Sequence, residues 1–124
     1  MLEDKRKMAK YEVELCTYII KLSDKSEWSK NDFHKIYNKI IIFMKKAKID
    51  EINLLNSGFF ILRQSNAFKV IDFDDYNKVK SSFRRLIDEV PIPEAIACIA
   101  CITKNIITDN KLNFIDLKSE VDEK

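Results

Sequence analysis

The chain has one glycine and two prolines among its 124 residues, and this scarcity limits what it can fold into. Glycine reaches positive φ angles without a clash at Cβ, so phosphate-binding loops, two-residue hairpin turns and strained nucleophile turns depend on it. A dinucleotide-binding fingerprint or a P-loop needs at least two glycines, so neither can be present. The composition therefore favours a succession of helices over a fold rich in tight turns.

The overall composition is that of one globular domain, expected to span residues 1–124. A hydrophobic fraction of 46% and an aromatic fraction of 10% are typical of a packed protein and not of a disordered one. The three cysteines are an odd number, which is a poor basis for a disulfide framework. No apolar run follows the charged N-terminus, and no stretch is long enough for a membrane span. We therefore expect a cytoplasmic protein without membrane contact.

Apolar residues recur at three- and four-residue spacing along five segments, as they do on one face of an α-helix. The spacing predicts helices over about Asp4–Leu22, Phe33–Ala47, Ile52–Asn66, Tyr76–Val90 and Pro93–Ile107, with a short sixth helix beginning near Asn113. The fifth helix is apolar nearly all round and should be buried. Ile41 and Ile42 widen the apolar stripe of the second, which predicts a central position. The fold class is therefore all-α, a compact bundle of five to six short helices.

Four helix starts share a capping signature. A serine, aspartate or asparagine is followed three residues later by an acid or amide, with apolar residues just before and four after the cap. The signature stands at Ser29, Asp50, Asp72 and Asn113. Because each cap oxygen accepts a hydrogen bond from an otherwise unpaired amide, each cap contributes about 1 kcal/mol.

The segment Gly58–Leu62 is the one place where a strand competes with a helix, because its apolar run has no clear period. No second segment has the pattern of a strand that could pair with it, so we expect a helix. Gly58 then costs about 1 kcal/mol of helix stability and allows a neighbouring helix to approach closely.

Cys98 and Cys101 form a C-x-x-C pattern, which is typical of redox or zinc sites in other settings. Here the pattern lies inside an apolar helix, and only Cys16 and His34 could complete a zinc site. We interpret the two cysteines as small buried hydrophobic residues. His34, the only histidine, falls on the polar side of its helix and is interpreted as a solvated residue. The acidic cluster at residues 72–75 does not fit a calcium loop. With the cysteines and His34 interpreted in this way, no catalytic residue, metal ligand or cofactor is predicted.

Basic residues are unevenly distributed. Residues 25–48 contain seven lysines and two acids, net +5, whereas residues 91–124 contain four lysines and six acids, net −2. On the second helix three lysines should share the face opposite the core stripe, and on the fourth helix three basic residues lie close together. The candidate partner-binding residues are Lys35, Lys39, Lys46, Lys80, Arg84 and Arg85. Such faces attract phosphates or an acidic partner, although many lysine-rich helices are simply solvated.

The sequence favours a non-enzymatic protein-binding module, with a small inhibitor or immunity-type protein as the best hypothesis. The absence of recognisable catalytic motifs, the small size and the heavy use of isoleucine, lysine and asparagine, which indicates an AT-rich genome, all agree with this class. The alternative is a nucleic-acid-associated accessory subunit that uses the basic faces of the second and fourth helices. No aromatic residue is interleaved with these lysines for base stacking, which weakens that alternative.

Overall fold

Five α-helices make up most of residues 2–64 and 74–108, the parts of the chain that this computed structural model describes. In chain order they are α1 (Leu2–Ser23), α2 (Lys30–Ala47), α3 (Glu51–Gln64), α4 (Tyr76–Glu89) and α5 (Ile92–Ile107). No strand occurs in these ranges, so the predicted all-α bundle is confirmed, and residues 58–62 lie inside α3. The sixth helix expected near Asn113 lies outside the described residues.

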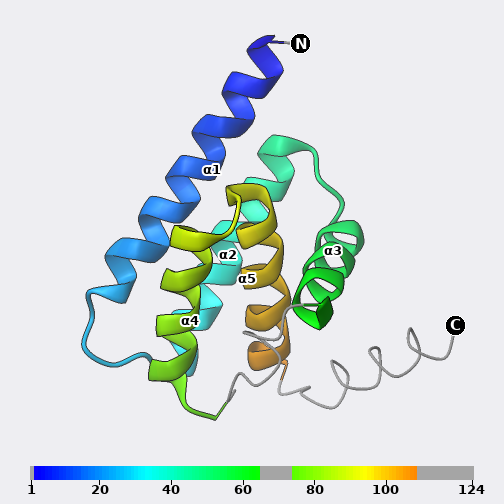
Figure 1. The fold of residues 1–124 in the computed structure, drawn as a ribbon. Coiled ribbons are helices and arrows are strands. Elements are labelled where there is room, and N and C mark those ends of the chain that lie inside the picture. Colours follow the sequence, from blue (N-terminus) through cyan, green and yellow to red (C-terminus); the bar gives the residue numbers. More distant parts are fainter. Residues whose placement is uncertain (1, 65–73, 109–124) are drawn as a thin grey trace, which may run out of the picture.

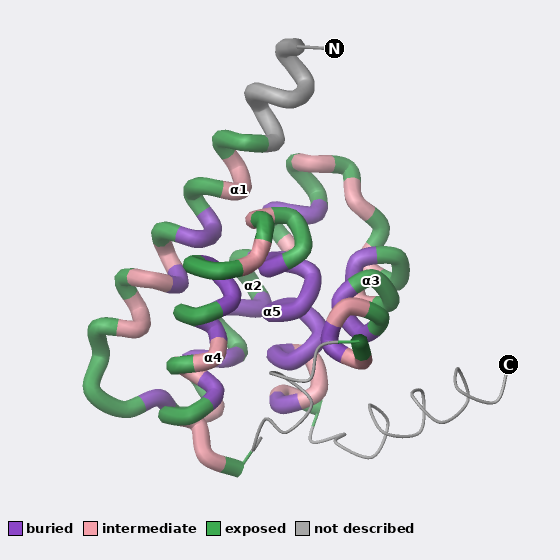
Figure 2. The backbone as a smooth tube through the Cα atoms, in the orientation of Figure 1, coloured by how far each residue is buried: buried purple, intermediate pink, exposed green. Residues whose placement is uncertain are grey.

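Helix α5 lies at the centre of the bundle. In Figure 1, α1 and α4 lie to one side of it, α3 to the other, and α2 behind. Every residue from Ala95 to Thr103 is buried, and so is Ile106, which gives the continuous buried stretch of α5 in Figure 2. Because neighbouring helices pack around this helix, its apolar residues all find contacts, and the predicted burial is confirmed.

Helix α3 packs against α5 at the only glycine of the chain. A Cβ atom at position 58 would overlap the carbonyl oxygen of Ala97 and lie 2.5 Å from its carbonyl carbon. The thiol of Cys98 also lies 3.9 Å from the carbonyl oxygen of Gly58. The glycine therefore permits a close helix contact, as expected, and its φ angle is not positive.

Two of the predicted helix caps are confirmed. The carboxylate of Asp32 accepts a hydrogen bond from the backbone N–H of Ser29 at 2.8 Å, at the start of α2. The carboxylate of Asp50 accepts one from the N–H of Asn53 at 3.1 Å, at the start of α3. Both bonds pair amides that have no partner within their own helix.

The cap predicted at Asp72 is wrong. Helix α4 begins at Tyr76, and its N-cap is Asp75, whose Oδ1 accepts from the N–H groups of Asn77 and Lys78 at 3.1 and 3.3 Å. Asp75 does not carry the full signature, because Asp74 precedes it and Lys78 stands three residues after it. Only the position of the first helical turn shows that Asp75 is the cap. The fourth signature, at residue 113, lies outside the described residues.

The link between α1 and α2 is held by side chains that are distant in sequence. The indole N–H of Trp28 donates to the carbonyl oxygen of Leu22 at 2.9 Å, and the ring meets Phe33 and Phe83 edge-on at centroid distances of 5.3 and 5.8 Å. The ammonium group of Lys80 donates to the carbonyl oxygens of Lys25 and Ser26 at 3.0 and 3.1 Å. These bonds connect the link to the end of α1 and to α4.

Helix α2 buries a narrower stripe than the sequence predicts. Its buried apolar residues are Phe33, Ile36, Tyr37, Ile40, Phe43 and Met44. Ile41 is half-buried, and Ile42, expected to widen the stripe, is 46% exposed.

Within residues 2–64 and 74–108, no helix combines the length and the apolarity that a membrane crossing requires.

Candidate functional site

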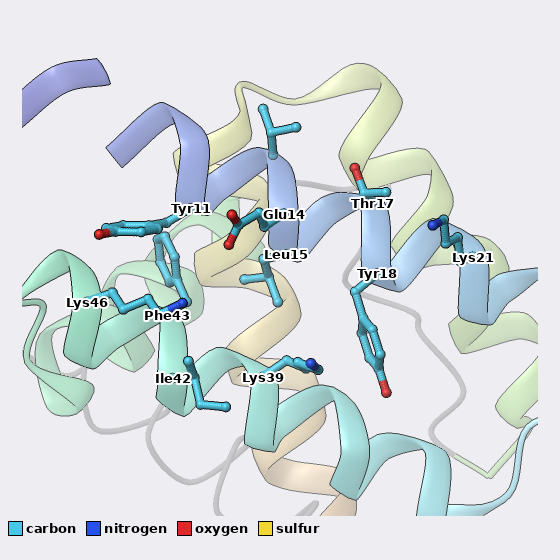
Figure 3. Close-up of a pocket in the computed structure, with 11 residues that line it drawn as sticks. Tyr11, Glu14, Leu15, Thr17, Tyr18, Lys21, Lys39, Ile42, Phe43 and Lys46 are labelled. Carbon is cyan, nitrogen blue, oxygen red and sulfur yellow. The ribbon is translucent and has the colours of Figure 1, made fainter. Parts of the chain in front are cut away.

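A groove of about 410 Å³ runs between α1 and α2 (Figure 3). Both helices contribute polar and apolar side chains to it. Its lining consists of Tyr11, Val13, Glu14, Leu15, Thr17, Tyr18, Lys21, Lys39, Ile42, Phe43 and Lys46. We call this surface the α1–α2 groove.

Two lysines of α2 lie over two tyrosine rings of α1. The ammonium nitrogen of Lys39 is 5.0 Å from the centroid of the Tyr18 ring, and that of Lys46 is 5.4 Å from the centroid of the Tyr11 ring. Ammonium groups at this distance are attracted by the negative face of the ring. The rings therefore favour positions of both charges beside the groove.

The groove also has an apolar component. Of its apolar lining residues, Leu15 and Phe43 are buried, whereas Val13 and Ile42 are 61% and 46% exposed. Large apolar side chains that remain this exposed gain contact area when another surface covers them. The groove thus combines apolar contact surface with fixed charge.

The charge of the groove is positive. Lys21, Lys39 and Lys46 contribute three positive charges, and Glu14 contributes one negative charge. Because positive charges outnumber negative charges in the lining, anionic groups such as carboxylates and phosphates are the chemically complementary ligands. It offers no nucleophile paired with a base, the arrangement that covalent catalysis needs.

The six basic residues predicted from the sequence do not form one surface. Lys39 and Lys46 lie in the groove, and Lys35 is exposed one helical turn from Lys39. The two groove lysines were expected on the face of α2 opposite its core stripe. They lie instead on the side of α2 that borders α1. The reason is that α1 packs along this flank of α2 and places its tyrosines there.

The three candidates on α4 have intramolecular contacts. Lys80 donates to the carbonyl oxygens of residues 25 and 26 at 3.0 and 3.1 Å. Arg84 donates to Oγ of Ser23 at 3.3 Å, and Arg85 forms an ion pair with Glu89 at 3.0 Å. The first two residues thus connect α4 to the end of α1 and the link after it, and the third pairs within α4. No residue of α4 lines the α1–α2 groove.

The remaining candidates for chemistry lie where the sequence analysis placed them. Cys98 and Cys101 are buried in α5, and burial raises the pKa of each thiol to about 12. His34 is exposed on α2. Among residues 9–64 and 74–108, whose side chains the structure describes, no three side chains of the histidine, cysteine, aspartate or glutamate type lie together as a metal would require.

A polar cluster joins three helices on the side of α2 that faces α3 and α5. The hydroxyl of Tyr37 donates to Oε2 of Glu51 at 2.6 Å, and Lys104 lies 3.7 Å from the same oxygen and 5.1 Å from the Tyr37 ring centroid. Burial and the Glu51 carboxylate raise the pKa of Tyr37 above its ordinary value. The hydroxyl therefore stays protonated and acts as a donor that ties α2 to α3.

A second hollow, of about 900 Å³, lies between α3 and the start of α5. Phe60 is 52% exposed beside it, and Glu94 is the one charged side chain of its lining. It lacks the paired, positioned charges of the α1–α2 groove. The α1–α2 groove is therefore the better candidate for selective binding.

The tyrosines and the exposed apolar residues of the groove were not predicted as site residues from the sequence. Tyr11 and Tyr18 belong to the apolar pattern that predicts the first helix, yet both are only half-buried. Their spacing of seven residues, and the phenol group at the edge of an apolar stripe, were the available signals.

Comparison of the chain with protein-family models, curated proteins and solved structures found no match.

Proposed function

We propose that this chain is a non-enzymatic protein-binding module whose α1–α2 groove holds an acidic segment of a partner protein. The observation that carries the proposal is the pair of ammonium groups, Lys39 over Tyr18 and Lys46 over Tyr11, beside an open apolar groove. Positively charged side chains that are held in place before binding lose little freedom when a carboxylate arrives.

Charge complementarity supports an acidic partner. The lining carries three lysines against one glutamate, which would steer an acidic surface toward the groove and favour it over a basic one. Val13 and Ile42 would then lose their exposure to water against apolar side chains of the same segment. Lys35, exposed on α2, would extend the positive rim. A small inhibitor or immunity-type protein would act through such a surface.

Nucleic acid is the alternative partner of the same lysines. Two observations favour protein instead. The three basic residues of α4 have contacts with carbonyl, hydroxyl or carboxylate groups of the chain itself. In addition, Glu14 places a negative charge in the groove, where it would repel a phosphate backbone.

The test is a selection of random sixteen-residue peptides, displayed on phage, against the whole chain. We expect the selected peptides to be enriched in aspartate, glutamate and apolar residues. They should bind the double variant Lys39→Gln/Lys46→Gln at least about tenfold more weakly, because both fixed charges are lost.

Lys45→Gln is the matched control, because Lys45 is exposed on the same helix and does not line the groove. Circular dichroism should give the same helix content for all variants, since the substituted lysines are exposed. Selected peptides that bind the double variant as tightly as the original chain would contradict the proposal. A chain that yields no acidic peptides but binds random single-stranded oligonucleotides, with affinity falling steeply as salt rises, would support the alternative.

A further inference from the structure

The two lysine–tyrosine pairs have the same spacing on both helices. Tyr11 and Tyr18 are seven residues apart on α1, and Lys39 and Lys46 are seven residues apart on α2. Since an α-helix rises 1.5 Å per residue, the two positive charges are separated by about 10 Å along the groove.

An exposed apolar side chain lies between the two charges. Ile42 follows Lys39 by three residues and precedes Lys46 by four, which places the three residues along one stripe of α2. All three line the groove, as Figure 3 shows. The stripe therefore presents a positive charge, an apolar group and a second positive charge in succession.

The groove also carries a negative charge between its two ends. Glu14 lies between Tyr11 and Tyr18 in α1 and lines the groove with them. A ligand with an unbroken row of anionic groups would bring one of them close to this carboxylate, which costs free energy. A ligand whose charges are separated by an apolar group avoids this repulsion.

We propose that the α1–α2 groove recognises an α-helical segment with two carboxylates seven residues apart and an apolar residue between them on the same face. The proposal rests on the function proposed above and specifies the form of the partner. A helix places side chains i, i+3 and i+7 on one face, with i and i+7 about 10 Å apart, which matches the two lysines.

An extended segment does not match this spacing. Along a strand, alternate side chains point to opposite faces, so those on one face are separated by about 7 Å or about 13 Å. Neither separation places two carboxylates against both lysines at once. The docked helix would instead lie along α1 and α2 as an additional helix of the bundle, with its apolar residue against Ile42.

The inference is tested with three fluorescein-labelled peptides of identical composition in a helix-forming alanine and glutamine background. The first has two glutamates seven residues apart and a leucine three residues after the first glutamate. The second has the glutamates five residues apart, on different faces of the helix. The third keeps the seven-residue spacing and moves the leucine to the opposite face. An oligothymidine of ten nucleotides is the fourth probe, and binding is measured by fluorescence anisotropy.

We expect the first peptide to bind at least about tenfold more tightly than the second, because the second can place only one carboxylate on a lysine. The third should bind more weakly than the first, because its leucine cannot cover Ile42. Equal binding of the three peptides would overturn the inference and leave the acidic-segment function standing. Failure of all three peptides, with or without binding of the oligonucleotide, would overturn both.

Discussion

Gly58 of α3 lies against the carbonyl group of Ala97 in α5, and neither backbone leaves room for a methyl group between them. Close contact of this kind lets two helices bury their apolar faces with little space between their axes. Since α5 is the central helix of the bundle, this close approach lets α3 pack directly against the core.

Substitution of this glycine by alanine is expected to destabilise the protein by about 2 kcal/mol. The added Cβ would overlap the Ala97 carbonyl oxygen, and this backbone group cannot rotate away, so the helices must separate. The loss outweighs the gain of about 1 kcal/mol in helix propensity. Urea unfolding followed by the fluorescence of Trp28, the single tryptophan, measures the change. Ser57→Ala, at the exposed neighbouring position, is the control and should leave stability unchanged or slightly higher; an equally stable glycine variant would show that the contact is loose.

Asp32 makes stability depend on acid pH. Its carboxylate is buried, which raises its pKa, but the Ser29 N–H and the Lys25 ammonium group, 3.0 Å away, outweigh burial and hold the pKa below the ordinary value of 3.8. A lowered pKa in the folded state means that the unfolded chain binds the proton more readily. The stabilisation is therefore complete well above pH 3.8 and is lost as the pH falls through the folded-state pKa.

Asp32→Asn should remove this acid dependence and lower the free energy of unfolding at pH 7 by about 2 kcal/mol, since a charged acceptor is lost at a helix start. Urea titrations between pH 2 and pH 7 measure both effects. Asp88→Asn, at an exposed position of α4, should keep the acid dependence of the original chain. Identical pH profiles for the original chain and the Asp32 variant would contradict the assignment.

The three cysteines are expected to be unreactive in the folded protein. Burial raises the pKa of Cys16 to about 11, with a contribution from the Glu12 carboxylate, and burial raises those of Cys98 and Cys101 to about 12. At pH 8 the thiolate fraction is therefore very small, and the sulfur atoms are shielded from reagents. Reaction with Ellman's reagent should be slower than in denaturant by on the order of a hundredfold or more. Rapid modification of one cysteine in the native state would mean that its helix opens readily.

Tyr37→Phe should cost about 1 kcal/mol, because it removes the 2.6 Å hydrogen bond to Glu51 that joins α2 to α3. Tyr18→Phe is the matched control, since a phenyl ring retains the contact with Lys39 and the change should be close to zero. Thermal unfolding of the two variants makes the comparison. A larger effect at Tyr18 than at Tyr37 would reverse the roles given to these residues.

Much of the fold could be predicted from the sequence because the signals are local. The apolar residues of α5 cover all its faces, and such a helix avoids contact with water only when other helices surround it. The caps at the starts of α2 and α3 depend on residues three positions apart in the chain. Scarcity of glycine excluded turn-rich folds for the same reason, since φ preferences belong to the individual residue.

The candidate site could not be predicted in this way, because it depends on which helix covers which flank. Lys39 and Lys46 lie over Tyr18 and Tyr11, which belong to another helix, and none of the five described helices covers Ile42. Local periodicity says which residues share a face of one helix and nothing about what lies against that face. Local patterns were enough to predict the five helices of the described residues and their apolar faces. The packing of α1 along α2 created the groove, because packing joins residues that no local rule connects.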